Sequence, residues 1–564
     1  MRTRDGVRLD ADVYCPVGEG PFPVLLMRQP YGRAIASTIV YAHPRWYAKH
    51  GYIVVIQDVR GRGTSEGEFD LFTHEVEDAE DTLQWAAQLT HSDGQIGMYG
   101  FSYQGMTQLY AAQTKRASLK TIVPAMTGYR LYEDWAYENG ALCLQLGLTW
   151  AIQLAAETAR RKRQKPAYQA LLAAAKSLPL SDGIAAQPTV LEETDSFFHS
   201  WISQPQFSHY WKGLTPQLEG IDIPTLHIGG WFDPYLRGDI RLHRELSHRQ
   251  PQQHHLWIGP WGHIPWGQKV GEVDFGPAAM SPVDTLQIQW FDHVLKGEPL
   301  SRKIGESENI AGRANTSGDV ASKSLQLSPE RPICLFEMGR NQWRSLSSWP
   351  QENIATYFLH GQGLENIRTD SGLLTRERPV TVSHSSVVHD PWNPAPARGG
   401  HSALPAGMFE RTDIDLRGDI LTFTSSPLEQ ALRVAGVVEF MGAIASSAIS
   451  YDLCVVLSRV TEGKVYNLTQ GYRRISLSAF HDEAQLATVP LHPTCFSLSP
   501  GECLRLSLSL ACFPAYAVNP GTGTQPELAE SIEAQIITVS IATGGERGAS
   551  VRLPLAPINK AELS

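Results

Sequence analysis

The sequence has no long hydrophobic run and no disulfide pattern. Its 564 residues contain no apolar stretch of about 18 residues, so a membrane-spanning helix is not expected. The N-terminus lacks the apolar core of a secretory signal. The seven cysteines are odd in number, scattered and without a CxxC pair, which argues against a disulfide framework or a zinc cluster. Free buried thiols are the simplest interpretation and favour a cytoplasmic protein.

The chain also lacks an excess of positive charge. It has 48 Lys and Arg against 58 Asp and Glu, a formal charge of −10. Nucleic-acid-binding proteins need a basic surface to neutralise phosphates, so this balance argues against that class. The basic run 160–163 is short and isolated, and it is interpreted as a solvated helix face. With 42% hydrophobic and 9% aromatic residues, the chain can bury large cores and is not disordered.

The first part of the chain alternates strand patterns with helix patterns. Helical spacing marks 75–89, and a helix-like segment follows residue 105. Short apolar runs typical of strands buried on both faces lie at 23–27, 52–56, 96–99 and 121–123. The alternation predicts an open, mostly parallel sheet covered by helices, beginning with residues 1–128.

The pattern changes near residue 129 and returns near residue 224. Residues 129–223 are rich in Ala, Leu and Gln and predict a helical insertion. Strand patterns at 224–228 and 255–258, and a helix ending near Lys296, predict the second part of the sheet domain over 224–325. Its last residues, 301–325, are polar and are interpreted as a linker or surface loop.

Beyond residue 325 the helical signal fades. Short strand patterns, one of them Ile333–Phe336, are separated by Gly, Pro, Ser and Asn over residues 326–564. This spacing favours an all-β jelly roll or β-sandwich.

The strongest chemical signal is Gly100-x-Ser102-x-x-Gly105 between a predicted strand and a predicted helix. Such a turn lifts the serine hydroxyl above the edge of the sheet and places the amide of Tyr103 at a helix N-terminus, where it can stabilise an oxyanion. The motif alone is equally compatible with a glycine-rich turn.

A nucleophilic serine needs a general base and an orienting carboxylate. Asp233 follows strand 224–228, and His263 follows strand 255–258, in the chain order of α/β hydrolases. Asp233 could instead cap the next helix, and His263 could be a surface histidine. His254, Asp222 and Asp239 fit worse, since they lie before or inside their elements.

Several motifs resemble the cocaine esterase/Xaa-Pro dipeptidyl-peptidase-like (CocE/NonD) serine hydrolases. They are the opening 4–9, DVRGRGTSEG at 58–67, GFSYQG at 100–105, GWFD at 230–233, GPWGH at 259–263, and two strings of the last domain at 466–471 and 519–523. The resemblance implies an α/β hydrolase fold with an inserted helical cap and a C-terminal jelly roll. The string 58–67 is interpreted as architectural, its acids and arginines neutralising one another.

The resemblance also implies residue roles. The catalytic set is Ser102, Asp233 and His263, with the hydroxyl of Tyr31 and the amide of Tyr103 forming the oxyanion hole. Trp135, Trp150 and Tyr235 are candidates for an aromatic substrate pocket, although core packing is an equal explanation. No cofactor or metal is expected.

The substrate is expected to be a small-molecule ester or amide. Relatives that bind an α-ammonium group place two acids just after the catalytic Asp, where this chain has Tyr235 and Leu236. Glu133 and Asp134 remain possible substitutes, although solvated helix acids are the simpler interpretation. A carboxylic ester with a neutral or aromatic acyl group is therefore favoured.

The alternatives are an Xaa-Pro dipeptidyl-peptidase or acyl amidase with the same catalytic set, and a non-catalytic ligand-binding protein. Neither a nucleic-acid nor a membrane partner is expected. By analogy with other C-terminal β domains, this one is expected to offer a surface for a homodimer.

Overall fold

The computed structural model describes residues 1–180, 189–300, 327–350, 353–477 and 484–556. The segment 301–325, predicted as a linker, lies outside these described residues. Within them, no helix is long and apolar enough to cross a membrane.

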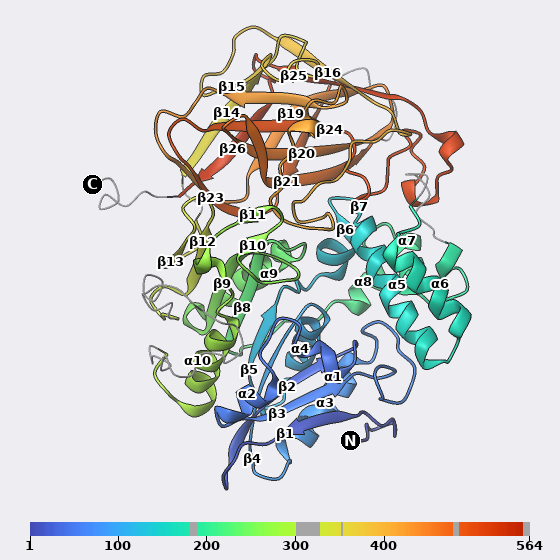
Figure 1. Cartoon of the computed structure of the whole chain (residues 1–564), viewed down its shortest axis with the longest axis vertical. Coiled ribbons are helices and arrows are strands. Elements are labelled where there is room, and N and C mark those ends of the chain that lie inside the picture. Colours follow the sequence, from blue (N-terminus) through green and yellow to red (C-terminus); the bar gives the residue numbers. More distant parts are fainter. Residues whose placement is uncertain (181–188, 301–326, 351–352, 478–483, 557–564) are drawn as a thin grey trace.

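A nine-stranded, mainly parallel sheet forms the lower half of the molecule in Figure 1. Its strands, in spatial order, are β1 (Ala11–Tyr14), β3 (Ile53–Asp58), β2 (Phe22–Gln29), β4 (Ser92–Phe101), β5 (Leu119–Ala125), β8 (Thr225–Phe232), β9 (His254–Gly262), β12 (Ile333–Glu337) and β13 (Gln342–Leu346). Only β1 and β13 pair antiparallel with their neighbours. The strand order reverses around β2 and β4, and open α/β sheets bind ligands at such a point.

The central strands are apolar because both faces of the sheet are covered. On β2, Val24 and Leu26 pack into one core cluster with residues of α3 and α4, whereas Leu25 and Met27 pack into another with residues of α10. This arrangement explains the unbroken apolar runs of the sequence. The associated helices are α1 (Arg33–Ala36), α2 (Pro44–Lys49), α3 (Glu75–Ala87), α4 (Tyr103–Gln113), α9 (Leu236–Ser247) and α10 (Val283–Lys296).

Between β5 and β8 the chain forms a group of helices beside the sheet (Figure 1). A π-helical turn at Leu131–Ala136 leads into the hairpin β6 (Tyr137–Glu138) and β7 (Ala141–Leu142). The helices of this group are α5 (Leu144–Arg161), α6 (Lys165–Lys176), α7 (Phe197–Ser203) and α8 (His209–Leu214), with a 3₁₀ turn at Thr189–Leu191.

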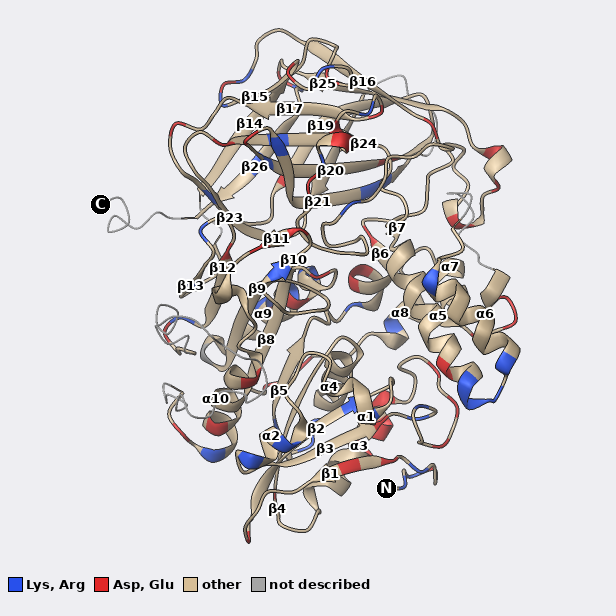
Figure 2. Ribbon diagram, in the orientation of Figure 1, with Lys and Arg blue, Asp and Glu red and all other residues tan. Residues whose placement is uncertain are grey.

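The basic run lies where α5 turns into α6, at the blue corner of these helices in Figure 2. Its interpretation as a wholly solvated face is wrong for one residue. Arg161 donates hydrogen bonds to the backbone oxygens of Gly63 and Ser65, the latter across 2.8 Å. The run therefore ties α5 to the loop after β3.

A 13-stranded sheet forms the C-terminal β domain, in the upper half of Figure 1. The strands are β14 (Asn353–His360), β15 (Gly372–Thr375), β16 (Ser383–His389), β17 (Leu421–Ser425), β18 (Leu432–Gly436), β19 (Glu439–Ser446), β20 (Ser450–Thr461), β21 (Lys464–Ser476), β22 (Gln485–Pro490), β23 (Thr494–Leu498), β24 (Cys503–Ser509), β25 (Ile537–Thr543) and β26 (Ser550–Leu555). The finer description as a jelly roll remains a prediction. The segment Ile333–Phe336, expected in this domain, instead joins the first sheet, because β12 pairs with β9.

Smaller elements connect these units. They are the hairpin β10 (Lys269–Val270) and β11 (Val273–Asp274), the short helix α11 (Thr412–Asp415), and 3₁₀ turns at Pro251–Gln253, Pro277–Ala279, Pro526–Leu528 and Ser531–Glu533.

A buried polar cluster joins the helical insertion to its neighbours. The carboxylate of Glu138 in β6 accepts from Tyr516 across 2.6 Å and from His401 across 2.8 Å, both of the C-terminal domain. It also pairs with Arg237 of α9 across 2.6 Å. Because a buried carboxylate is costly unless paired, these contacts fix the three parts against one another.

Candidate active site

Ser102 lies at a strained turn between β4 and α4. Its φ of 60° and ψ of −127° are unfavourable for a residue with a side chain, and only 6% of the residue is exposed. A Cβ added to Gly100 would lie 2.4 Å from Gln104, and one added to Gly105 would lie 2.6 Å from the Cβ of Thr127. The two glycines of the motif are therefore required by close packing, which lets α4 start directly after the serine.

Asp233 and His263 meet at the same edge of the sheet. Asp233 follows β8 and His263 follows β9, and the Oδ2 atom of Asp233 lies 2.5 Å from Nδ1 of His263. The Oδ1 atom accepts from the amide of Tyr235 across 2.9 Å, in the turn before α9. The alternative interpretation of Asp233 as the N-cap of this helix is wrong, because Tyr235 occupies that position. The imidazole is partly exposed and packs against the ring of Phe101, beside Ser102, with centroids 5.4 Å apart.

Tyr31 follows β2, the neighbour of β4, so its hydroxyl lies beside Ser102 at the point where the strand order reverses. The indole N–H of Trp150 donates to this hydroxyl across 3.1 Å. Burial raises the pKa of Tyr31 to about 12, against the opposing effect of its hydrogen bonds with Trp150 and Ser102. The phenol therefore stays protonated at neutral pH and can donate. The amide of Tyr103 begins α4, where N–H groups have no acceptor within the helix.

The three predicted pocket aromatics come together around this site. The ring of Trp135 stacks on Tyr235 with centroids 4.4 Å apart and lies 5.2 Å from Trp150. Tyr235 in turn meets the edge of the His263 ring at 5.2 Å. Trp135 is 3% exposed, and its indole N–H donates to the backbone oxygen of Thr127, so Trp135 forms a buried wall of the candidate pocket. The half-buried Trp150 lies between this wall and Tyr31.

The two acids of the π-helical turn lie in different surroundings, and only Asp134 departs from the interpretation as a solvated acid. Asp134 is not solvated: it is buried, accepts from the amides of Tyr129 and Arg130, and pairs with Arg241 across 3.1 Å. Glu133 is exposed, as expected of a solvated acid, and also pairs with Arg241, across 2.9 Å. Both carboxylates are thus engaged by protein groups.

Sequence reasoning missed the support beneath Ser102. The hydroxyl of Thr127 donates to the backbone oxygen of Ser102 across 2.8 Å. Asp239 of α9 accepts from the amides of Thr127 and Gly128 across 3.0 and 2.8 Å, and burial raises the pKa of Asp239. Asp239 was rejected as the triad acid because it lies inside a predicted helix. In the structure its carboxylate holds the loop after β5. The sequence signal that could have found it is an acid on the mainly apolar face of a predicted helix.

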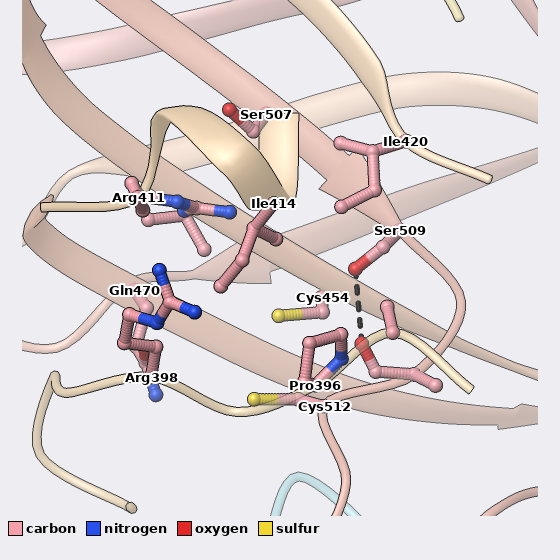
Figure 3. A pocket seen from close by; sticks show the side chains of 13 residues that line it. Pro396, Arg398, Arg411, Ile414, Ile420, Cys454, Gln470, Ser507, Ser509 and Cys512 are labelled. Atoms are coloured by element: carbon pink, nitrogen blue, oxygen red, sulfur yellow. Dashed lines mark hydrogen bonds between the residues drawn. The ribbon is translucent and has the colours of Figure 1, made fainter. Parts of the chain in front are cut away.

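Other candidate ligand sites are sparse in the part of the chain that the structure describes. No group of three or more His, Cys, Asp or Glu residues there is arranged to hold a metal ion. A cavity in the C-terminal domain, shown in Figure 3, has a volume of about 20 Å³, which is room for one water molecule. It is lined by residues such as Arg411, Cys454 and Cys512 and by none of the residues around Ser102.

Comparison with known proteins agrees with this architecture. Residues 5–265 match the X-Pro dipeptidyl-peptidase (S15 family), and residues 328–549 match the X-Pro dipeptidyl-peptidase C-terminal non-catalytic domain. The cocaine esterase of Rhodococcus sp. (strain MB1 Bresler) is 29% identical over 555 residues, which cover 92% of this chain and 91% of that protein.

Solved structures share the fold over nearly the full length. An aminopeptidase from a marine sediment archaeon (Thaumarchaeota archaeon) superposes with a TM-score of 0.79 at 20% identity, covering 99% of this chain and 95% of that one. An α-amino acid ester hydrolase superposes with a TM-score of 0.75 at 20% identity, covering 98% and 95%.

The chain is a serine hydrolase with an α/β hydrolase-like N-terminal domain and a C-terminal β domain. It belongs to the cocaine esterase/Xaa-Pro dipeptidyl-peptidase-like family, as its motifs indicated.

Proposed function

We propose that the protein hydrolyses carboxylic esters through a catalytic set of Ser102, His263 and Asp233. The observation that carries this proposal is the 2.5 Å contact between Asp233 and His263 at the sheet edge where Ser102 is held at a strained turn. A serine held at a strand–helix turn, with an oriented imidazole nearby, is the arrangement that activates a hydroxyl for nucleophilic attack.

In the proposed reaction Ser102 Oγ attacks the ester carbonyl and transfers its proton to Nε2 of His263. Asp233 holds the Nδ1–H tautomer and stabilises the imidazolium that forms. The tetrahedral intermediate collapses, the C–O bond breaks, and His263 returns the proton to the leaving alkoxide. Water then attacks the acyl-enzyme by the same route and releases the acid.

The negative oxygen of the intermediate is bound by two donors, the hydroxyl of Tyr31 and the amide of Tyr103. Since Trp150 donates to the Tyr31 oxygen, the phenol's own proton is left for Ser102 in the resting enzyme and for the oxyanion during reaction. Preorganised donors of this kind stabilise the transition state more than the neutral carbonyl.

The acyl group is proposed to be neutral or aromatic. Trp135, Trp150 and Tyr235 supply aromatic walls beside His263 and Tyr31. The carboxylates of Glu133 and Asp134, which could have bound an ammonium group, are paired with Arg241. This pairing supports an ester over a peptide N-terminus or an α-amino ester.

Labelling with a fluorophosphonate tests the class of reaction. We expect the wild-type protein to be labelled at Ser102 and the Ser102→Ala variant to remain unlabelled. A folded wild-type protein that stays unlabelled would contradict the catalytic set. A panel of p-nitrophenyl esters, Xaa-Pro p-nitroanilides and acyl amides then tests the substrate, and hydrolysis of the anilides faster than the esters would favour a dipeptidyl-peptidase.

A further inference from the structure

The loop 58–67 was expected to neutralise its own charges, but its charged residues pair with groups outside the loop instead. Asp58 binds Arg33 across 2.5 Å. Arg60 binds Asp5 and Asp78 across 2.7 and 2.6 Å. Arg62 is the exception in this loop, and its surroundings point to a function.

Arg62 is a buried guanidinium without a carboxylate partner. The residue is 2% exposed, its Nη1 atom donates to the backbone oxygen of Leu154 across 3.0 Å, and its guanidinium lies 3.7 Å over the ring of Phe69. Within the described ranges it forms no ion pair, and its Nε atom has no hydrogen-bond partner. The charges of Glu157 and Arg161 act on its pKa in opposite directions. Burial lowers the pKa of Arg62 to about 10, so the group keeps its charge at neutral pH.

This charge lies next to the elements that carry both oxyanion donors. Leu154 is one turn beyond Trp150 in α5, and Trp150 donates to the hydroxyl of Tyr31. The ring of Phe69, beneath the guanidinium, lies 6.1 Å from the ring of Tyr103. Arg62 therefore reaches Tyr31 through Leu154 and Trp150 of α5 and reaches the ring of Tyr103 through Phe69, and both tyrosines interact electrostatically with its charge.

We propose that Arg62 is a positioning residue that supplies a fixed positive charge behind the oxyanion hole, acting through Tyr31 and Tyr103 on the tetrahedral intermediate. In a low-dielectric interior a charge acts over several ångströms, and it favours an anionic oxygen over the neutral carbonyl of the substrate. An unpaired buried cation is costly to the fold, which is the expected sign of a functional constraint. The inference rests on the proposed ester hydrolysis.

Phenylboronic acid, which forms an anionic tetrahedral adduct with an active serine, is the probe. We expect Arg62→Met to weaken its inhibition constant and to lower kcat by about tenfold each, with KM changed less than about twofold. Arg161→Met is the matched control, because Arg161 also joins α5 to loop 58–67 but bonds the backbone oxygens of Gly63 and Ser65. The control should leave boronate binding and kcat within about twofold.

The Arg62→Lys variant keeps the positive charge and changes the shape of the side chain, so it distinguishes the two contributions. It also tests the proposal if the Met variant does not fold. At pH 6.5 it should retain most of the boronate affinity, since the charge is kept. As pH rises, the buried ammonium loses its proton before a guanidinium would, so kcat of the Lys variant should fall while that of the wild type does not.

Each outcome is decisive. A folded Met variant that binds boronate as the wild type does, or a Lys variant with a wild-type pH profile, overturns the role of Arg62. Labelling of the wild type by fluorophosphonate is measured separately. Labelling at Ser102 together with no effect of the Arg62 variants contradicts only the role of Arg62, whereas absence of labelling contradicts the catalytic set itself.

Discussion

The indole N–H of Trp150 lies 3.1 Å from the hydroxyl oxygen of Tyr31. Trp150 belongs to α5 of the helical insertion, and Tyr31 follows β2 of the first sheet. The insertion therefore contributes a hydrogen bond to the proposed oxyanion hole as well as a wall to the pocket. Because the indole can only donate, the contact fixes which way the phenol hydrogen points.

Replacing Trp150 by Phe tests this contact, since the ring is largely kept and the donor is lost. We expect kcat for a p-nitrophenyl ester to fall about 3- to 30-fold, because an unoriented phenol is a poorer oxyanion donor. KM should change less than kcat. The same substitution at the exposed Trp392 should leave both constants unchanged, and an equal loss at the two positions would contradict the role of the hydrogen bond.

Asp233→Asn keeps the size of the side chain and an oxygen that can accept from the amide of Tyr235. The amide cannot hold the Nδ1–H tautomer of His263 as the carboxylate does, so kcat should fall by about 10³- to 10⁴-fold. The melting temperature, measured on the same sample, should change little. A variant with more than about a tenth of the wild-type kcat would show that another group orients His263.

The parallel strands and the place of Ser102, Asp233 and His263 at their carboxyl ends could be predicted from sequence, because buried strands and strand–turn–helix junctions are local patterns. The burial of Asp134 could not, because its partners are the loop 129–130 and Arg241, which is distant in the sequence. The sheet to which Ile333–Phe336 belongs could not be predicted either, because it depends on the long-range pairing of β12 with β9.

Arg62 illustrates the same limit. Its charged neighbours in the loop pair with acids and arginines outside the loop, whereas its own partners are Phe69 and a backbone oxygen of α5. No pattern within the loop distinguishes Arg62 from Arg60. The difference arises only when the helical insertion folds against the first sheet.

Gly105→Ala tests the close packing behind Ser102. The added Cβ would lie 2.6 Å from the Cβ of Thr127, whose hydroxyl donates to the backbone oxygen of Ser102. We expect a loss of about 1–3 kcal/mol in the free energy of unfolding and a lower kcat. Gly213→Ala in α8, where no atom lies within 4 Å of the new Cβ, should instead be neutral or stabilising by up to about 1 kcal/mol. Urea denaturation of both variants makes the comparison.

Four histidines are buried at the other end of strands β8 and β9, and three of them lie together on one face of the sheet. His227 lies with His243 and His254 at ring-centroid distances of 5.3 and 6.1 Å, whereas His255 packs against Trp290 of α10 at 5.2 Å. Burial lowers the pKa of His254 and His255 to about 4 and that of His243 to about 3, and it lowers that of His227 further below its usual range. The other charged groups near them are Asp222, Arg244 and His293. The folded protein therefore holds all four imidazoles neutral at neutral pH.

This cluster predicts a loss of stability in acid. Because the folded pKa values are depressed, the unfolded chain takes up protons first, so stability is complete above about pH 6.5 and declines as pH falls toward 4. At pH 5 each histidine accounts for about 2 kcal/mol of the decline. His227→Leu should therefore narrow the difference in unfolding free energy between pH 7 and pH 5 by about that amount, as measured by urea denaturation. His384→Leu, at an exposed position, is the control and should leave the difference unchanged. An equal effect of the two substitutions would assign the acid sensitivity to groups outside the cluster.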